Sequence, residues 1–142
     1  MTPQPARWRE RGQVTAFVVT LAAALILMAG LVLDGGLVLA AKRRAINEAE
    51  AAARAGAQQV AVDVYRSTGR FVLDPTRARA AALAYLAATG DPGTVSVAAD
   101  RVTVTVRITQ PMQILSAAGL GPATVIGRGA ATAERGVQQA EP

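Results

Sequence analysis

A single uncharged stretch near the start of the sequence places the strongest constraint on the fold. No charged residue occurs from Gly12 to Leu33, and residues 14–33 read VTAFVVTLAAALILMAGLVL. As an α-helix, these 20 residues would be about 30 Å long, which matches the hydrocarbon core of a bilayer. Eleven of them are Leu, Ile, Val or Phe, which together favour membrane insertion by about 3 to 7 kcal/mol. The sequence therefore predicts a transmembrane helix over residues 12–33.

Two other interpretations of this stretch are less favourable. A cleaved signal peptide has an apolar region of about 7–15 residues, which is shorter than this one. The small-residue cleavage sites near Ala40 and Ala41 also lie well beyond the apolar run. A buried helix of a soluble protein would need cover on all sides, and a chain of 142 residues has too little other core to provide it. A retained membrane anchor fits best.

Composition excludes several classes of function. The chain has no Cys and no His, so it lacks thiol nucleophiles, disulfides, the commonest general base and the commonest metal ligand. We therefore expect no enzymatic activity, no catalytic residues, no cofactor, no metal and no small-molecule substrate. The net charge of +5 comes from scattered basic residues, and aromatic residues are only 4% of the chain. Without a stacking platform, nucleic-acid binding is not expected.

Charge at the two ends of the apolar stretch predicts its orientation. Arg7, Arg9 and Arg11 stand directly before it, whereas Asp34 follows it and the basic run 42–44 comes eight residues later. The positive-inside rule then places the N-terminus in the cytoplasm. The expected protein is a single-pass component of the cell membrane with an extracytoplasmic C-terminal domain. Its predicted segments are a cytoplasmic tail (1–11), a transmembrane helix (12–33), a juxtamembrane Ala-rich helix (34–66), a small exported α+β domain (67–133) and a disordered tail (134–142).

Alanines recur at every fourth position after the basic run. The set is Ala45, Ala49, Ala53, Ala57 and Ala61, and this spacing places small side chains on one face of a helix. Small residues allow a partner helix to approach closely. That partner can be the next helix of this chain or another subunit, including a second copy. Alanine richness without a packing role is the third alternative.

The C-terminal half predicts a second helix and a small sheet. Asp74 and Pro75 form a helix-start signal for residues 75–89. Residues 101–109 (RVTVTVRIT) alternate between apolar and polar side chains, as in a half-buried strand. Residues 94–98 and 123–133 are the other candidate strands, and the two glycines of the last one suggest a bulge or an edge position. The predicted class is α+β, with an antiparallel sheet of about three strands.

Asp34 is the one acidic residue beside the apolar stretch. An acid at this boundary can contact a partner or help to determine topology at the outer interface. Alternatively, it is a simple boundary residue that begins a turn through Gly35 and Gly36. The sequence leaves both interpretations open.

The ordered N-terminal motifs resemble those of the TadE/TadG-like Flp (tight adherence) pilus assembly proteins. The resemblance covers residues 11–57 and consists of the Arg11-Gly12 junction, the apolar helix, Asp34-Gly35-Gly36 and the Ala-rich stretch that ends in Ala-Gly-Ala. The small α+β region is similar to that of short actinobacterial members of this group. The DxSxS signature of the longer members is absent, so their metal-dependent adhesion is not implied.

The resemblance implies a minor-pilin-like or assembly component of a Tad/Flp-type pilus or related secretion system. Its partners would be the lipid bilayer and other pilus or assembly-platform subunits. Related pilin precursors are cleaved after Gly, which here corresponds to the bond between Gly12 and Gln13, and they usually carry Glu five residues later, where this chain has Phe17. The alternative is a single-pass envelope protein, unrelated to pili, whose exported domain binds a ligand or partner.

Overall fold

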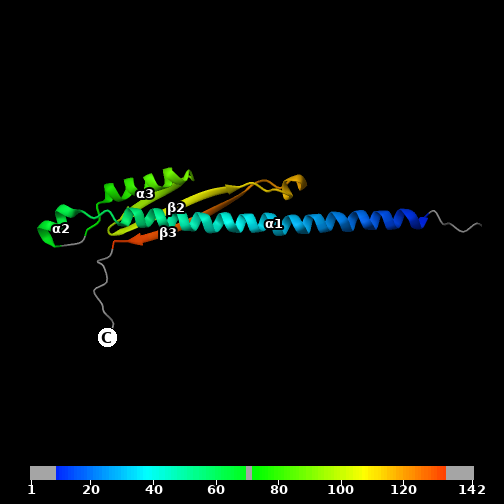
Figure 1. Ribbon diagram of the computed structural model, residues 1–142, viewed down its shortest axis with the longest axis horizontal. Coiled ribbons are helices and arrows are strands. Elements are labelled where there is room, and N and C mark those ends of the chain that lie inside the picture. Colours follow the sequence, from blue (N-terminus) through cyan, green and yellow to red (C-terminus); the bar gives the residue numbers. More distant parts are fainter. Residues whose placement is uncertain (1–8, 70–71, 134–142) are drawn as a thin grey trace, which may run out of the picture. The chain divides into compact units, whose positions relative to one another are not determined.

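The computed structural model describes residues 9–69 and 72–133, with side chains from residue 14 onward. It contains long and short helices and one three-stranded antiparallel sheet, which confirms the predicted α+β class. The helices are α1 (Arg9–Ala57), α2 (Val62–Thr68), α3 (Pro75–Thr89) and the 3-10 turn η1 (Leu115–Ala118). The strands are β1 (Gly93–Ala98), β2 (Arg101–Gln110) and β3 (Ala123–Thr132) (Figure 1).

Two compact units make up the chain. The first, the apolar unit, comprises Met1–Leu37 and Pro111–Pro122, and the second, the sheet unit, comprises Val38–Gln110 and Ala123–Pro142. Helix α1 contributes its first part to one unit and its last part to the other. The segment Pro111–Pro122, called here the 111–122 loop, connects β2 to β3 along the chain.

Helix α1 passes without a break through Gly35 and Gly36 and ends at Ala57. The expected helix over residues 34–66 therefore covers the end of α1, a short connection and part of α2. The chain leaves the helix because the next residues pair with a distant segment. Val60 forms a bridge with Leu73, and the N–H of Ala61 donates to the carbonyl of Val72 at 2.8 Å.

Helix α3 begins and ends where its sequence signals predict. The Asp74 carboxylate accepts hydrogen bonds from the N–H groups of Thr76 and Arg77, both at 3.0 Å, and Pro75 occupies the first helical position. Gly90 ends the helix with a left-handed φ of 78°, a conformation that glycine adopts without a steric penalty. Ala78, Ala82 and Leu86 form the buried face of α3.

The sheet has the order β1-β2-β3, and a tight turn at Ala99 and Asp100 joins its first two strands. Ala99 has a positive φ of 52° in this turn. The register pairs Val95 with Val104 and Val104 with Gly129. Because paired residues share one face of the sheet, the buried valines of β2 and the glycines of β3 lie on the same side. The pairing of β2 with β3 is continuous, so β3 is an edge strand without a bulge.

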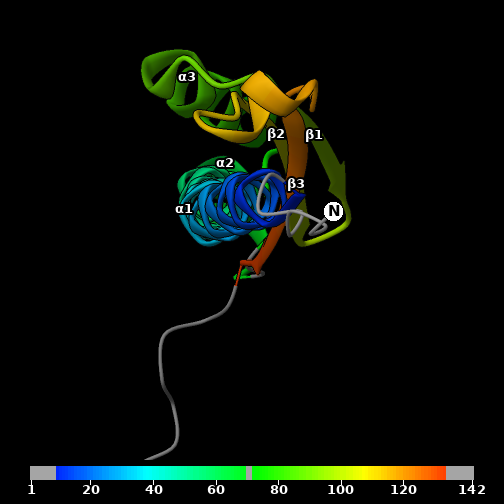
Figure 2. The same cartoon turned by 90° about the vertical axis from the view of Figure 1, so that its right-hand side faces the viewer.

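Within the sheet unit, the last part of α1 and helix α3 cover this inner face (Figure 2). Alanines of α1, the buried residues of α3 and the valines of β1 and β2 form one hydrophobic core. Leu86 of α3 lies against Gly93 of β1, where a Cβ atom would be 2.7 Å from the Leu86 Cδ1 atom. The outer face instead carries residues such as Ser96, Thr105 and Arg107.

Candidate functional site at the end of the apolar stretch

The apolar part of α1 has no cover from the described part of its own chain over most of its length. Large apolar side chains are exposed all around the helix, with Phe17 at 67% and Val32 at 73% exposure. This is the one helix in the described residues that is long and apolar enough to cross a membrane. Because exposed apolar surface of this extent is unfavourable in water, this stretch requires an apolar environment.

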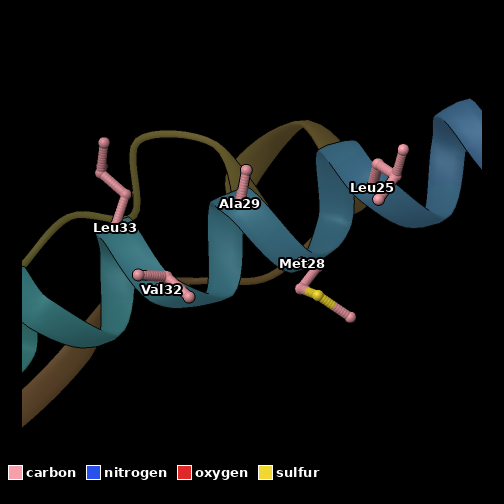
Figure 3. A pocket seen from close by; sticks show the side chains of 5 residues that line it. All are labelled: Leu25, Met28, Ala29, Val32 and Leu33. Carbon is pink, nitrogen blue, oxygen red and sulfur yellow. The ribbon is translucent and has the colours of Figure 1, made fainter.

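A shallow groove runs along this apolar surface near its end. It is lined by Leu25, Met28, Ala29, Val32 and Leu33, whose side chains project from successive turns of α1 (Figure 3). None of these five side chains carries a hydrogen-bonding group other than the weakly accepting thioether of Met28. The groove is therefore suited to acyl chains or to apolar side chains.

Asp34 is buried directly after this stretch, with only 1% of its surface exposed. Its Oδ1 atom accepts a hydrogen bond from the N–H of Gln113 at 2.8 Å. Its Oδ2 atom accepts hydrogen bonds from the N–H groups of Ile114 at 3.0 Å and Leu115 at 2.8 Å. The carboxylate thus satisfies three successive main-chain donors at the start of η1. Asp34 does not begin a turn, since α1 continues beyond it.

The charge of Asp34 is stabilised by these donors. Burial by itself raises the pKa of the Asp34 carboxyl, but the N–H groups of Leu115, Gln113 and Ile114 outweigh burial and leave the pKa below its ordinary value. A carboxylate that accepts several main-chain hydrogen bonds is held in its ionised form. Asp34 is therefore a charged anchor for the 111–122 loop.

Gly30 lies one helical turn before Asp34 and allows the loop to approach α1. A Cβ atom at this position would lie 2.7 Å from the Ile114 Cγ2 atom and 3.3 Å from the Leu115 Cδ2 atom. Gly35 and Gly36 differ, because a Cβ atom on either would meet nothing within 4 Å. Within the apolar unit, Gly30 thus provides the close contact, whereas the two glycines of the Asp-Gly-Gly motif do not.

The structure places the alanines of the predicted stripe in different environments. Ala45, Ala49 and Ala53 are fully buried, and Ala57 packs at the margin of the same core. Ala61 lies outside α1, directly before α2. Ala45 and Ala49 pack on β3 of the same chain, whereas Gly56, near the end of α1, lies against α3, where a Cβ atom would be 2.9 Å from the Ala78 carbonyl oxygen. A Cβ atom at Gly127 would overlap the Ala45 main chain, and one at Gly129 would lie 2.5 Å from the Ala49 carbonyl carbon.

Glycines 127 and 129 therefore serve close packing between a helix and a strand. Sequence reasoning connected them with a bulge or an edge and did not identify their partner. Their i, i+2 spacing was the available signal, because it places both on one face of a strand. Gly30 and the donors at 113–115 had no comparable signal.

Two of the three basic residues after the apolar stretch are bound within the sheet unit. The Lys42 ammonium donates to the carbonyl of Ile126. Arg44 pairs through Nε with Glu48 Oε1 at 2.7 Å and through Nη2 with Asp91 Oδ2 at 2.5 Å. The exposed pairs of Arg44 contribute little to stability. They fix the side chain toward its own chain, so it is less available for lipid head groups.

The predicted processing position, Gly12 and Gln13, lies within α1. Their surroundings fall outside the part of the chain that the structure describes. Of the expected N-terminal tail over residues 1–11, residues 9–11 belong to α1 and residues 1–8 lie outside the described part of the chain. The expected C-terminal tail at 134–142 also lies outside it.

Comparison with known proteins finds one family model that matches part of this chain. Residues 12–59 match the family model described as putative Flp pilus-assembly TadE/G-like. The match contains the exposed apolar helix, Asp34-Gly35-Gly36 and the buried alanines, and it confirms the resemblance for this segment. No curated protein and no solved structure matches the chain.

Proposed function

We propose that this protein is a membrane-anchored, non-enzymatic structural component of a Tad/Flp-type pilus or of its assembly machinery. One observation carries the proposal: the TadE/G-like segment 12–59 covers nearly all of α1. The first part of this helix is the exposed apolar stretch, and its last part packs on the sheet. The anchor is residues 12–33, the N-terminus is cytoplasmic and the sheet unit is extracytoplasmic. Contacts with the bilayer and with other pilus or platform subunits are made through packing.

Deletion of the gene in its native host tests the assignment to a pilus. We expect loss of surface pili in electron micrographs and recovery with the wild-type gene. A variant with Val18→Arg and Leu25→Arg should fail to restore pili, because each Arg costs about 2.5–3.5 kcal/mol at the centre of a membrane helix. Ser96→Arg adds the same type of charge to an exposed strand position and should restore them. Unchanged piliation after deletion would contradict the proposal.

The proposed orientation has a separate test. The chain has no native Cys, so Ser96→Cys introduces a single thiol in the sheet unit. A membrane-impermeant maleimide should label this thiol in intact cells. Labelling that requires cell lysis would place the sheet unit in the cytoplasm and overturn the orientation.

Two finer roles differ in the mature N-terminus. A minor-pilin-like role requires processing, and mass spectrometry of the native membrane protein would then detect a chain that starts at Gln13. A permanent component of the assembly platform would keep Met1 or start at Thr2. We favour the pilin-like role if a start at Gln13 is found in sheared pilus fractions as well as in membranes.

A further inference from the structure

The 111–122 loop is long for a connection between neighbouring antiparallel strands, and it carries no charged residue. It joins two antiparallel neighbours, β2 and β3, for which connections of about 2–5 residues are usual. The whole stretch from Ile108 to Gly127 contains no charged residue, and Arg107 and Arg128 stand on its two sides. Long connections exposed to water normally carry charge and polar turn residues. This loop instead reads PMQILSAAGLGP.

The loop lies beside the apolar part of α1. Its contacts reach Gly30, where a Cβ atom would be 2.7 Å from the Ile114 side chain. Gly30 belongs to the 12–33 segment and precedes Asp34 by four residues, or about 6 Å along a helix axis. A segment in contact with Gly30 therefore shares the depth of the last turn of the apolar stretch. This depth is typical of apolar groups that enter the boundary between head groups and acyl chains, about 5–10 Å.

A large part of the loop's backbone N–H groups meets the requirement for such a location. Irregular backbone near the hydrocarbon region is stable only where its polar groups have protein partners. Asp34 accepts from three successive N–H groups of the loop. Further along, the N–H groups of Ala117, Gly119 and Leu120 donate to carbonyls of the loop itself.

The surface that the loop presents is mainly apolar. Leu120 is 49% exposed, and Met112 and Ile114 are half-buried. The Ser116 hydroxyl donates to the Gln113 carbonyl at 3.3 Å, so part of the loop's polarity is satisfied internally. Apolar side chains beside a membrane helix, on a loop whose own residues carry no charge, match a lipid surface better than water.

We propose that the 111–122 loop inserts into the membrane interface as a second lipid contact, held there by Asp34 and seated on Gly30. The partner is the lipid bilayer, in the leaflet on the side of the C-terminal part of the chain. The proposal rests on the membrane anchorage proposed above for residues 12–33. It adds that the anchor is a helix together with a non-helical segment, and that Leu120 contacts lipid.

The absence of native Cys makes a site-specific test direct. Three full-length variants carry one environment-sensitive fluorophore, nitrobenzoxadiazole, in phospholipid nanodiscs. Leu120→Cys reports on the loop, Val19→Cys is the membrane reference and Ser96→Cys is the water reference. Each is quenched separately with a nitroxide-bearing phospholipid and with aqueous iodide. Amide hydrogen exchange at residues 113–115 in the labelled Leu120→Cys protein verifies that the loop stays bound to Asp34.

The expected result is that the Val19 and Leu120 probes lose most of their emission to the nitroxide lipid and little to iodide, whereas the Ser96 probe shows the reverse. Iodide quenching at Leu120 with lipid quenching at Val19 would overturn the loop insertion and leave the anchorage intact. Quenching by neither reagent would place Leu120 against protein and would also overturn it. A Val19 probe without lipid quenching would refute the anchorage and the inference together.

Discussion

The carboxylate of Asp34 accepts a hydrogen bond from the main-chain N–H of Leu115 at 2.8 Å, although the two residues are 81 positions apart. At most helix starts, a nearby Ser, Thr, Asp or Asn side chain performs this function. The turn η1 has Ile114 at its N-cap position and no local side-chain cap. Asp34 supplies the missing acceptor from α1. Asp34, which the sequence motif places at the end of the membrane helix, therefore also caps a turn that is distant in the sequence.

Removal of the negative charge at position 34 should release the 111–122 loop. Asp34→Asn keeps the size of the side chain, but its amide group would turn N–H donors toward the donors of the loop. We expect faster amide hydrogen exchange at Gln113, Ile114 and Leu115 in the full chain in nanodiscs. Asp63→Asn, at an exposed position in α2, is the matched control and should leave this exchange unchanged. Equal protection in both variants would contradict the role of Asp34 as a cap.

Acidification should produce the same release without a mutation. Because the folded-state pKa of Asp34 lies below its ordinary value of 3.8, its contribution to stability is complete above that value and is lost as pH falls through the lowered pKa. The Leu115 amide resonance, followed by NMR during an acid titration, should report a midpoint below 3.8. The Asp34→Asn variant should lack this transition, and a midpoint above 3.8 would refute the assignment.

The close contact between β3 and α1 should tolerate no side chain. In Gly127→Ala, the added methyl group would overlap the main chain of α1 at Ala45. We expect a loss of about 1–3 kcal/mol in the free energy of unfolding. Urea unfolding of the full chain in detergent micelles, followed through the amide resonances of Val104 and Val106, measures this loss. In Gly121→Ala the methyl group would meet nothing within 4 Å, so the unfolding midpoint should stay near that of the wild type.

Substitution of Gly36 by alanine should stabilise the chain, in contrast to substitution of Gly127. This residue lies inside α1, and a Cβ atom there would meet nothing within 4 Å. Alanine is favoured over glycine in a helix by about 1 kcal/mol, so Gly36→Ala should slow amide exchange in the adjacent turns of α1. Gly30→Ala is the contrasting variant, because its Cβ would press on Ile114 and should speed exchange in the loop. A destabilised Gly36→Ala chain would be inconsistent with the open surface at this position.

The same Gly36→Ala variant also tests assembly. A subunit that packs closely at this glycine in the pilus would exclude the added methyl group, although the isolated chain would be more stable. Reduced piliation together with a stabilised α1 would then assign the Asp-Gly-Gly motif to an intermolecular contact. Normal piliation would show that no other subunit packs closely against Gly36.

Several parts of the fold follow from local sequence signals. Asp74 and Pro75 set the start of α3, because their preferences are satisfied by residues two and three positions away. The alternation of residues 101–109 identifies β2, since one face of a sheet is buried and the other is not. The end of α1 was less predictable. Alanine-rich sequence favours a helix beyond Ala57, but pairing of Val60 with Leu73 overrides that local preference.

The sequence alone determined the apolar helix, the α+β class and the small-residue face of α1, because each depends on composition or on a spacing of a few residues. Only the tertiary structure decided what these features contact. It placed the alanines on Gly127 and Gly129 of β3, and it placed Asp34 on the N–H groups of the 111–122 loop. The physical reason is that helix periodicity specifies which face is small or charged, whereas the partner is set by packing between segments about 80 residues apart.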